Sequence, residues 1–352
     1  MYVSTFAIFG LIIFLGVIYI KQKGITTKIY KVSKYLCPDN KLLSLVCCIN
    51  QNKIRVPQNP NQKQPPKPYY TRGSYTYQYD LNDTFFYDMI NGDISKPAVV
   101  IAPYICGHSK SACVRRLANE FSQSGHSVYV LLPRGSLDTK FSLECKKLRC
   151  EVIDSEDIDT LVGLIPNKQV ILAGYSLGAL NICYYMTKSQ QIVNRSKVIK
   201  VIMSFIEFDL NYVLKLPSRI QKEIGSCIVP YVDNNREYFN KHGISEKSID
   251  NIVKMSTVYQ YDQEITIKTW KTQSVQEYYD IIAIIPMIEH IKVPALFIST
   301  ADDIITGPLV PFEEMEKNNL VNSVVFNYGN HLGTVTSDGR DMVCQLIGQW
   351  CQ

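Results

Sequence analysis

Histidine, concentrated charge and regularly spaced cysteine are all scarce in this sequence. The formal net charge is only +5, and Lys and Arg are scattered without forming a basic stripe, so nucleic acid is not an expected partner. Cys145 and Cys150 have no histidine nearby, and Cys47 adjoins Cys48. Neither arrangement is typical of a zinc site. We therefore expect reduced, mostly packed thiols and no metal centre.

Charged residues are absent between Tyr2 and Ile20, and lysines follow directly at 21, 23 and 28. This run is long enough to cross a hydrocarbon core of about 30 Å as a helix. No basic residue precedes it, so residues 1–20 indicate an uncleaved anchor and not a signal peptide. The positive-inside rule then predicts a single-pass protein of the endoplasmic reticulum or another endomembrane, with its body facing the cytoplasm. Sequons at Asn82 and Asn194 leave a lumenal body as the alternative.

Proline and aromatic residues mark the boundaries of the remaining segments. Residues 21–73 are interpreted as a connector that is Pro-rich at 56–68 and therefore extended. In residues 74–352, apolar runs alternate with helical patterns, which predicts an α/β fold with a mostly parallel central sheet and flanking helices. The aromatic-rich, helical stretch at about 205–290 interrupts this alternation. We expect it to form a helical lid insertion over the site.

The segment Gly174-Tyr175-Ser176-Leu177-Gly178 follows an apolar run that reads as a buried strand, and it precedes a helical pattern. It fits the G-x-S-x-G nucleophile elbow, in which a strained strand-to-helix turn exposes the serine hydroxyl. Glycine two residues to either side permits close backbone packing. Ser176 is therefore the candidate nucleophile. The backbone N–H of Leu177 is a candidate donor to the oxyanion.

A serine nucleophile needs a histidine base and an acid, in the order Ser, Asp or Glu, His for this type of chain. Only five histidines are present, and His331 follows the last predicted strand in a glycine-containing loop. The acid should follow the strand at 295–299, where Asp302 and Asp303 are both candidates and we favour Asp303. The loop after the strand at 98–103 should supply a second backbone donor, for which we choose the N–H of Ile105.

Beyond these motifs, the chain resembles the membrane-anchored α/β-hydrolase-domain lipases, a family that includes bacterial YheT-like esterases, over about residues 70–350. The resemblance implies an α/β-hydrolase fold, with Ser176 as nucleophile, Asp303 as acid and His331 as base. It departs from the family pattern at Tyr104, where the family has Gly, and at Ile304, where it has Pro. The segments that carry the likeness are Leu-Pro-Arg-Gly at 132–135, Asp-Ser-Glu-Asp-Ile-Asp at 154–159, Ser-Thr-Val-Tyr-Gln-Tyr-Asp at 256–262 and Ser-Val-Gln-Glu-Tyr-Tyr at 274–279.

The resemblance implies a membrane-associated serine hydrolase acting on acyl esters such as monoacylglycerols, phospholipids or small carboxyl esters, with no metal or organic cofactor. An inactive membrane scaffold of the same fold is the alternative, if Tyr104 blocks the oxyanion site. A thioesterase or acyltransferase is a nearer alternative. Some relatives carry His-x4-Asp for acyl transfer, whereas here Thr336 stands five residues after His331.

Overall fold

Runs of apolar, largely branched residues form the fully buried central strands. They are β5 (Ala98–Ala102), β6 (Val128–Leu132), β7 (Val170–Tyr175) and β9 (Ala295–Thr300). Strands of a parallel sheet that is covered on both faces bury all their side chains, so their sequences do not alternate. β8 (Val198–Ser204) and β10 (Val321–Phe326) complete the parallel region. The predicted α/β class is confirmed.

The structure is a computed structural model that describes residues 18–22, 25–30, 68–137, 139–150, 154–188, 193–307, 310–326, 329, 331–333 and 341–351. Its strand order is β1-β2-β10-β9-β8-β7-β5-β6-β4-β3. β4 (Thr84–Ile90) is antiparallel to both β6 and β3 (Thr71–Thr76). The hairpin that opens this domain therefore begins at Thr71, a little before the predicted boundary at residue 74.

The N-terminal segment is described only in part. Ile18–Gln22 form β1 and Ile25–Tyr30 form β2, which is parallel to β10. The last residues of the predicted anchor, 18–20, thus lie in a strand and not in a helix, which corrects the predicted end of that helix. The rest of the anchor and the Pro-rich segment lie outside the described residues. Within the described ranges, no helix combines the length and the apolar character needed to cross a membrane.

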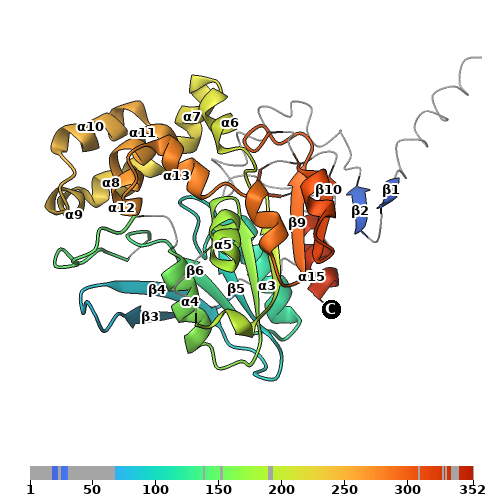
Figure 1. Cartoon of the computed structure of the whole chain (residues 1–352). Coiled ribbons are helices and arrows are strands. Elements are labelled where there is room, and N and C mark those ends of the chain that lie inside the picture. Colours follow the sequence, from blue (N-terminus) through green and yellow to red (C-terminus); the bar gives the residue numbers. More distant parts are fainter. Residues whose placement is uncertain are drawn as a thin grey trace, which may run out of the picture.

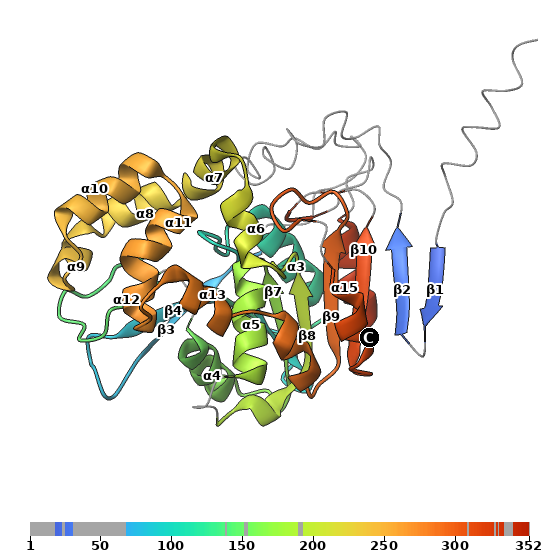
Figure 2. The same cartoon turned by 45° about the horizontal axis from the view of Figure 1, so that its top comes forward.

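Helices cover both faces of the central sheet (Figures 1 and 2). Consecutive residues of a strand point to opposite faces, so they meet different layers of helices. Val100 belongs to the core under α4 (Ser155–Leu164) and α5 (Leu177–Thr187). Its neighbour Ile101 belongs to the core under α3 (Ala112–Gln123) and α15 (Met342–Cys351). The buried apolar faces of these helices hold the parallel strands in register, which fixes the carboxyl ends of the strands where the site is built.

The chain between β8 and β9 forms a helical cap that lies at the carboxyl ends of the strands (Figure 2). It has its own core, in which Tyr238 stacks on Phe141 of the body with ring centroids 4.0 Å apart. The predicted insertion at 205–290 corresponds to this cap. Its helices are α6 (Leu210–Lys215), α7 (Ser218–Gly225), α8 (Ile228–Asn234), α9 (Arg236–Lys241), α10 (Glu246–Met255), α11 (Val258–Tyr261), the π-helix η3 (Asp262–Thr266), α12 (Ile267–Trp270), α13 (Val275–Ile281) and the 3-10 helix η4 (Ile285–His290).

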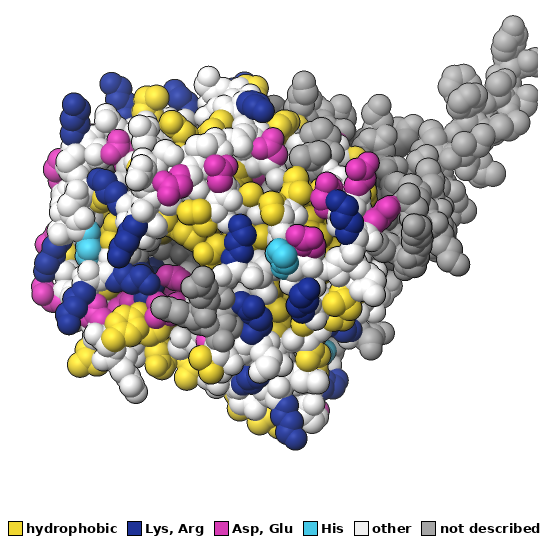
Figure 3. All heavy atoms as spheres, in the orientation of Figure 1, with side chains coloured by type: hydrophobic (Ala, Val, Ile, Leu, Met, Phe, Trp, Pro, Cys, Tyr) yellow, Lys and Arg dark blue, Asp and Glu magenta, His cyan; other side chains and the backbone are white. Residues whose placement is uncertain are grey.

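A buried ion network explains two of the segments that carry the family likeness. Arg134, which follows β6, contacts Asp157 of α4 at 2.6 Å and also pairs with Asp83. Arg149 contacts Asp83 at 2.6 Å as well. Because both arginines are buried, each needs its carboxylate partners. On the surface, by contrast, charges of both signs are interspersed over the face seen in Figure 3.

Candidate active site

Ser176 lies at the turn between β7 and α5, with backbone φ 51° and ψ −118°. This conformation is strained for a residue that has a Cβ atom. A Cβ on Gly174 would collide with the backbone of Ala179, and one on Gly178 would collide with the carbonyl oxygen of Ala102. Glycine at these two positions lets β5, β7 and α5 approach closely enough to hold the turn. The local sequence therefore determines how Ser176 is presented.

The structure brings Ser176, His331 and Asp303 together, although they are far apart in the chain. His331 Nδ1 lies 2.9 Å from Asp303 Oδ2, and His331 Nε2 lies 2.8 Å from Ser176 Oγ. An ionised carboxylate only accepts hydrogen bonds, so Nδ1 donates to Asp303. Nε2 is then left unprotonated and accepts from the serine hydroxyl. This is the arrangement required for a histidine to act as general base toward Ser176.

The His331 imidazole and two backbone donors keep the Asp303 carboxylate ionised. Its second oxygen, Oδ1, accepts hydrogen bonds from the N–H groups of Ile305 at 2.8 Å and Thr306 at 3.2 Å. Burial alone would raise the pKa of Asp303, but the adjacent His331 imidazole and these hydrogen bonds hold it below its ordinary value. A carboxylate that stays charged in a buried position can stabilise an imidazolium.

The neighbouring Asp302 has a different partner. Its Oδ1 accepts the backbone N–H of Gly329 at 2.9 Å, and burial raises its pKa to about 6. The geometry thus favours Asp303 over Asp302 as the partner of His331. Asp302 instead binds the backbone of the loop that carries the imidazole.

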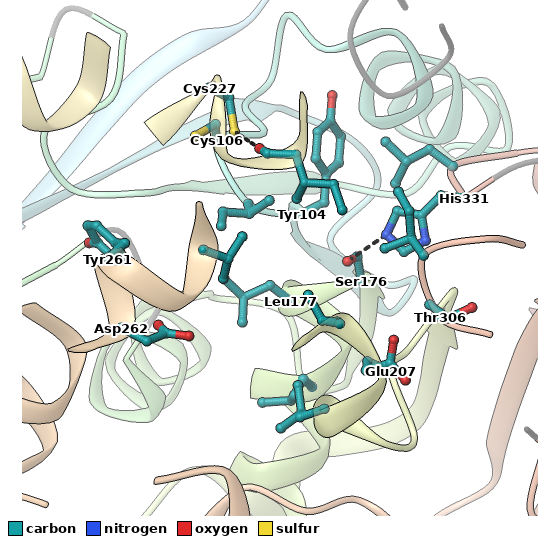
Figure 4. Close-up of a pocket in the computed structure, with 18 of the residues that line it drawn as sticks. Tyr104, Cys106, Ser176, Leu177, Glu207, Cys227, Tyr261, Asp262, Thr306 and His331 are labelled. Atoms are coloured by element: carbon teal, nitrogen blue, oxygen red, sulfur yellow. Dashed lines mark hydrogen bonds between the residues drawn. The ribbon is translucent and has the colours of Figure 1, made fainter. Parts of the chain in front are cut away.

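The two backbone positions chosen for the oxyanion lie at the same site. Leu177 is the first residue of α5, and Ile105 lies in the loop between β5 and α3; both line one pocket with Ser176. In Figure 4 the ring of Tyr104 points away from the Ser176 hydroxyl. The substitution of Tyr for Gly at this position therefore does not put a side chain over the nucleophile.

Phe205 and Glu207 also belong to the site, although no motif indicates them. Phe205 directly follows β8 with φ 57°, and its ring packs between those of Tyr175 and His331 with centroids 6.4 and 6.3 Å apart. Glu207 lines the pocket two residues later. Only the topology could have indicated these two residues from the sequence, because the carboxyl ends of neighbouring parallel strands meet at one edge of the sheet.

The pocket above Ser176 has a volume of about 380 Å³ and lies between the sheet and the cap (Figure 4). Apolar side chains from α5, the cap and the loop after it form most of its wall, which suits an apolar ligand. They include Leu180, Leu210, Val213, Ile224, Val258 and Ile282.

In the part of the chain that the structure describes, neither thiols nor metal-ligating side chains form a second candidate site. Most of the cysteines described there are buried. No three His, Cys, Asp or Glu side chains of the same ranges gather as they would around a metal ion.

Comparison with known proteins finds relatives of low sequence identity. No family model matches the chain. Human phospholipase ABHD3 is 20% identical over 247 residues, which cover 68% of this chain and 59% of that protein. Mouse monoacylglycerol lipase ABHD2 is 22% identical over 286 residues, covering 73% and 64%. The chain thus spans about three fifths of the length of these curated relatives.

A solved structure supports the fold. A bacterial membrane phospholipase A superposes with a TM-score of 0.50 and 14% identity, over 80% of this chain and 85% of that one. The strand order, the turn at Ser176 and the two curated relatives point the same way. The chain therefore has an α/β-hydrolase fold, and its sequence is similar to those of lipases and esterases.

Proposed function

We propose that this chain is a serine hydrolase that cleaves acyl esters of lipid-like substrates: monoacylglycerols, phospholipids or small carboxyl esters. The observation that carries the proposal is the hydrogen-bonded series Asp303–His331–Ser176 at the base of a mostly apolar pocket. The names of the relatives, a phospholipase and a monoacylglycerol lipase, support an acyl ester as substrate. An apolar wall next to the nucleophile suits an acyl chain.

In the proposed reaction, Ser176 Oγ bonds to the ester carbonyl carbon while His331 Nε2 takes the hydroxyl proton. Asp303 holds the imidazole in the required tautomer and stabilises its cation. Backbone N–H groups, for which we propose Leu177 and Ile105, stabilise the negative charge on the carbonyl oxygen. The carbon–oxygen bond to the alcohol then breaks, and His331 returns the proton to the leaving alcohol. Water, deprotonated by His331, cleaves the acyl-enzyme and releases the carboxylic acid.

We also propose that the protein is associated with a membrane of the cell, through an anchor in the uncharged N-terminal segment that precedes β1. The absence of charge from Tyr2 to Ile20 supports this, as does the cluster of lysines that follows. Membrane fractionation of the full chain, with and without residues 2–17, tests it and leaves β1 intact. Loss of the membrane-bound fraction on deletion is expected, and an unchanged distribution would reject the anchor.

Fluorophosphonate labelling of the full chain in detergent tests the proposed activity. Such probes react with an activated serine, so we expect labelling of the wild type and none of Ser176→Ala. Ser226→Ala is the matched control, because Ser226 lines the same pocket from the cap without contacting His331. Labelling that survives in Ser176→Ala, or a folded wild type that does not label, would reject the assignment and favour the scaffold alternative.

A further inference from the structure

Glu207 is a buried acidic residue on the wall of the pocket that the proposed reaction does not use. It follows the strained turn at Phe205 and precedes α6. Glu207, Ser176 and Thr306 line the same pocket, and in the view of Figure 4 Glu207 lies on the side of Ser176 whereas Asp262 lies toward the other end. With only 8% of its surface exposed, Glu207 is more than nine-tenths buried. The turn at Phe205 thus brings a carboxyl group to the wall of the pocket that holds the nucleophile.

The hydrogen bonds of this carboxyl are incomplete. Oε1 accepts the backbone N–H of Asp209 at 3.0 Å, whereas Oε2 is buried and has no hydrogen-bond partner within the described ranges. Burial raises the pKa of Glu207 to about 9, and the charges of Asp303 and Asp209 act in the same direction. At neutral pH the group therefore carries a proton and is a donor without an acceptor. Such a buried donor is unfavourable unless a ligand supplies the acceptor.

The charges of the side chains that line the pocket restrict the chemical class of that ligand. Among the described residues that line it, none is Lys or Arg, whereas Glu223 and Asp262 are acidic. Burial and the nearby Lys110 lower the pKa of His108, so that this lining residue is neutral as well. A phosphate group would find no cationic side chain here, and phosphate sites are commonly built from Arg or Lys. The acceptor for Glu207 should therefore be uncharged.

We propose that Glu207 is a specificity-determining residue of this pocket, whose carboxyl donates a hydrogen bond to an uncharged oxygen in the alcohol part of the substrate. Beyond its carbonyl, which the oxyanion donors hold, an acyl chain offers no acceptor. The acceptor must therefore come from the alcohol, as one of its hydroxyl oxygens. This inference rests on the proposed ester hydrolysis. It favours glycerol monoesters over esters whose alcohol carries a phosphate.

Binding of ethers that cannot be hydrolysed tests the proposal without requiring catalysis. The probes are a 1-O-alkylglycerol, its 3-phosphate, and the methyl ether of the same alkyl chain, measured calorimetrically with the full chain in detergent. Wild type should bind the alkylglycerol at least about 10-fold more tightly than the phosphate. This preference corresponds to roughly the strength of one good polar contact. Equal or tighter binding of the phosphate would overturn the proposed exclusion of charge.

Substitution separates the hydrogen bond from packing. Glu207→Gln keeps an acceptor for Asp209 and a donor for the ligand, so its affinity should stay close to wild type. Glu207→Met keeps the volume without a donor, and it should weaken the alkylglycerol about 3- to 10-fold while leaving the methyl ether unchanged. Glu223→Met, on α7 in the same pocket, is the matched control and should leave the ratio between the two probes unchanged.

A Glu207→Met variant that weakens both probes equally, or neither, would overturn the role of Glu207. With a monoacylglycerol as substrate, the same variant should raise KM and leave kcat unchanged, whereas disturbance of the triad would lower kcat. Fluorophosphonate labelling reports the proposed activity separately. Failure to label therefore concerns the hydrolase, while an unchanged binding ratio concerns Glu207 alone.

Discussion

The carboxylate of Asp302 accepts a hydrogen bond from the backbone N–H of Gly329 at 2.9 Å. Gly329 precedes His331 by two residues, and the adjacent Asp303 contacts the imidazole itself. Neighbouring aspartates after β9 thus hold one loop at two points. One fixes the backbone of the loop, and the other orients the side chain that it carries.

The two aspartates should respond differently to the same substitution. Asp303→Asn should lower kcat about 10⁴-fold, the loss seen when the corresponding aspartate of the serine-protease triad is changed, because the amide stabilises the wrong imidazole tautomer. Asp302→Asn keeps an oxygen for Gly329 and should change kcat less than about 3-fold, since the backbone hydrogen bond is retained. Steady-state hydrolysis of a soluble ester gives both values. Equal losses in the two variants would contradict these roles.

A methyl group at Gly178 should disrupt the turn that presents Ser176. A Cβ there would collide with the carbonyl oxygen of Ala102, and backbone cannot move aside as a flexible side chain can. We expect Gly178→Ala to lose about 1 to 3 kcal/mol of unfolding free energy through overpacking, and most of its fluorophosphonate labelling.

Gly243 provides the control for backbone conformation. It has φ +81°, and a Cβ there would meet no atom within 4 Å. Gly243→Ala should therefore lose only the free energy needed to hold alanine in the left-handed conformation, about 1 to 2 kcal/mol. Its fluorophosphonate labelling should stay complete. Normal labelling of Gly178→Ala would show that close packing of β5 on α5 is not needed for the turn.

Removal of one buried arginine should destabilise the whole domain. Arg134 contacts Asp83 and Asp157, both of which are also buried. Arg134→Ala leaves these carboxylates without one of their cations, so we expect the free energy of unfolding to fall by about 3 to 5 kcal/mol. Denaturant titration measures the change. The more exposed Arg236, which pairs with Asp233, Glu246 and Asp250, is the control; Arg236→Ala should shift the midpoint little.

The elements that sequence predicted well are those with a local cause. The elbow around Ser176 depends on two glycines within a few residues, and a strand such as β7 depends on one apolar run. Glu207 could not be found in this way, because its relation to Ser176 arises only when β8 pairs with β7. Nor could spacing distinguish Asp302 from Asp303. Consecutive residues of a turn point in different directions, and only the fold shows which one faces His331.

The pKa of Glu207 makes a prediction about stability that does not depend on activity. In the unfolded chain a glutamate has a pKa of about 4.3, whereas burial raises that of Glu207 to about 9 in the folded protein. Between these values the folded state keeps a proton that the unfolded state releases, so the contribution of Glu207 to stability falls as pH rises. The side chain of Glu207→Gln does not titrate, so the variant should not lose stability in this way as pH rises.

Thermal unfolding of the wild type and of Glu207→Gln at pH 5 and pH 8 measures this effect. The charged groups that act on Glu207, Asp303 and Asp209, are unchanged in the variant, so their own titration largely cancels in the comparison. We expect the melting temperature of the variant to rise relative to wild type from pH 5 to pH 8, by roughly 2 to 4 °C for each kcal/mol of linked free energy. Parallel curves would mean that Glu207 is ionised throughout, and the donor assigned to the pocket would then be absent.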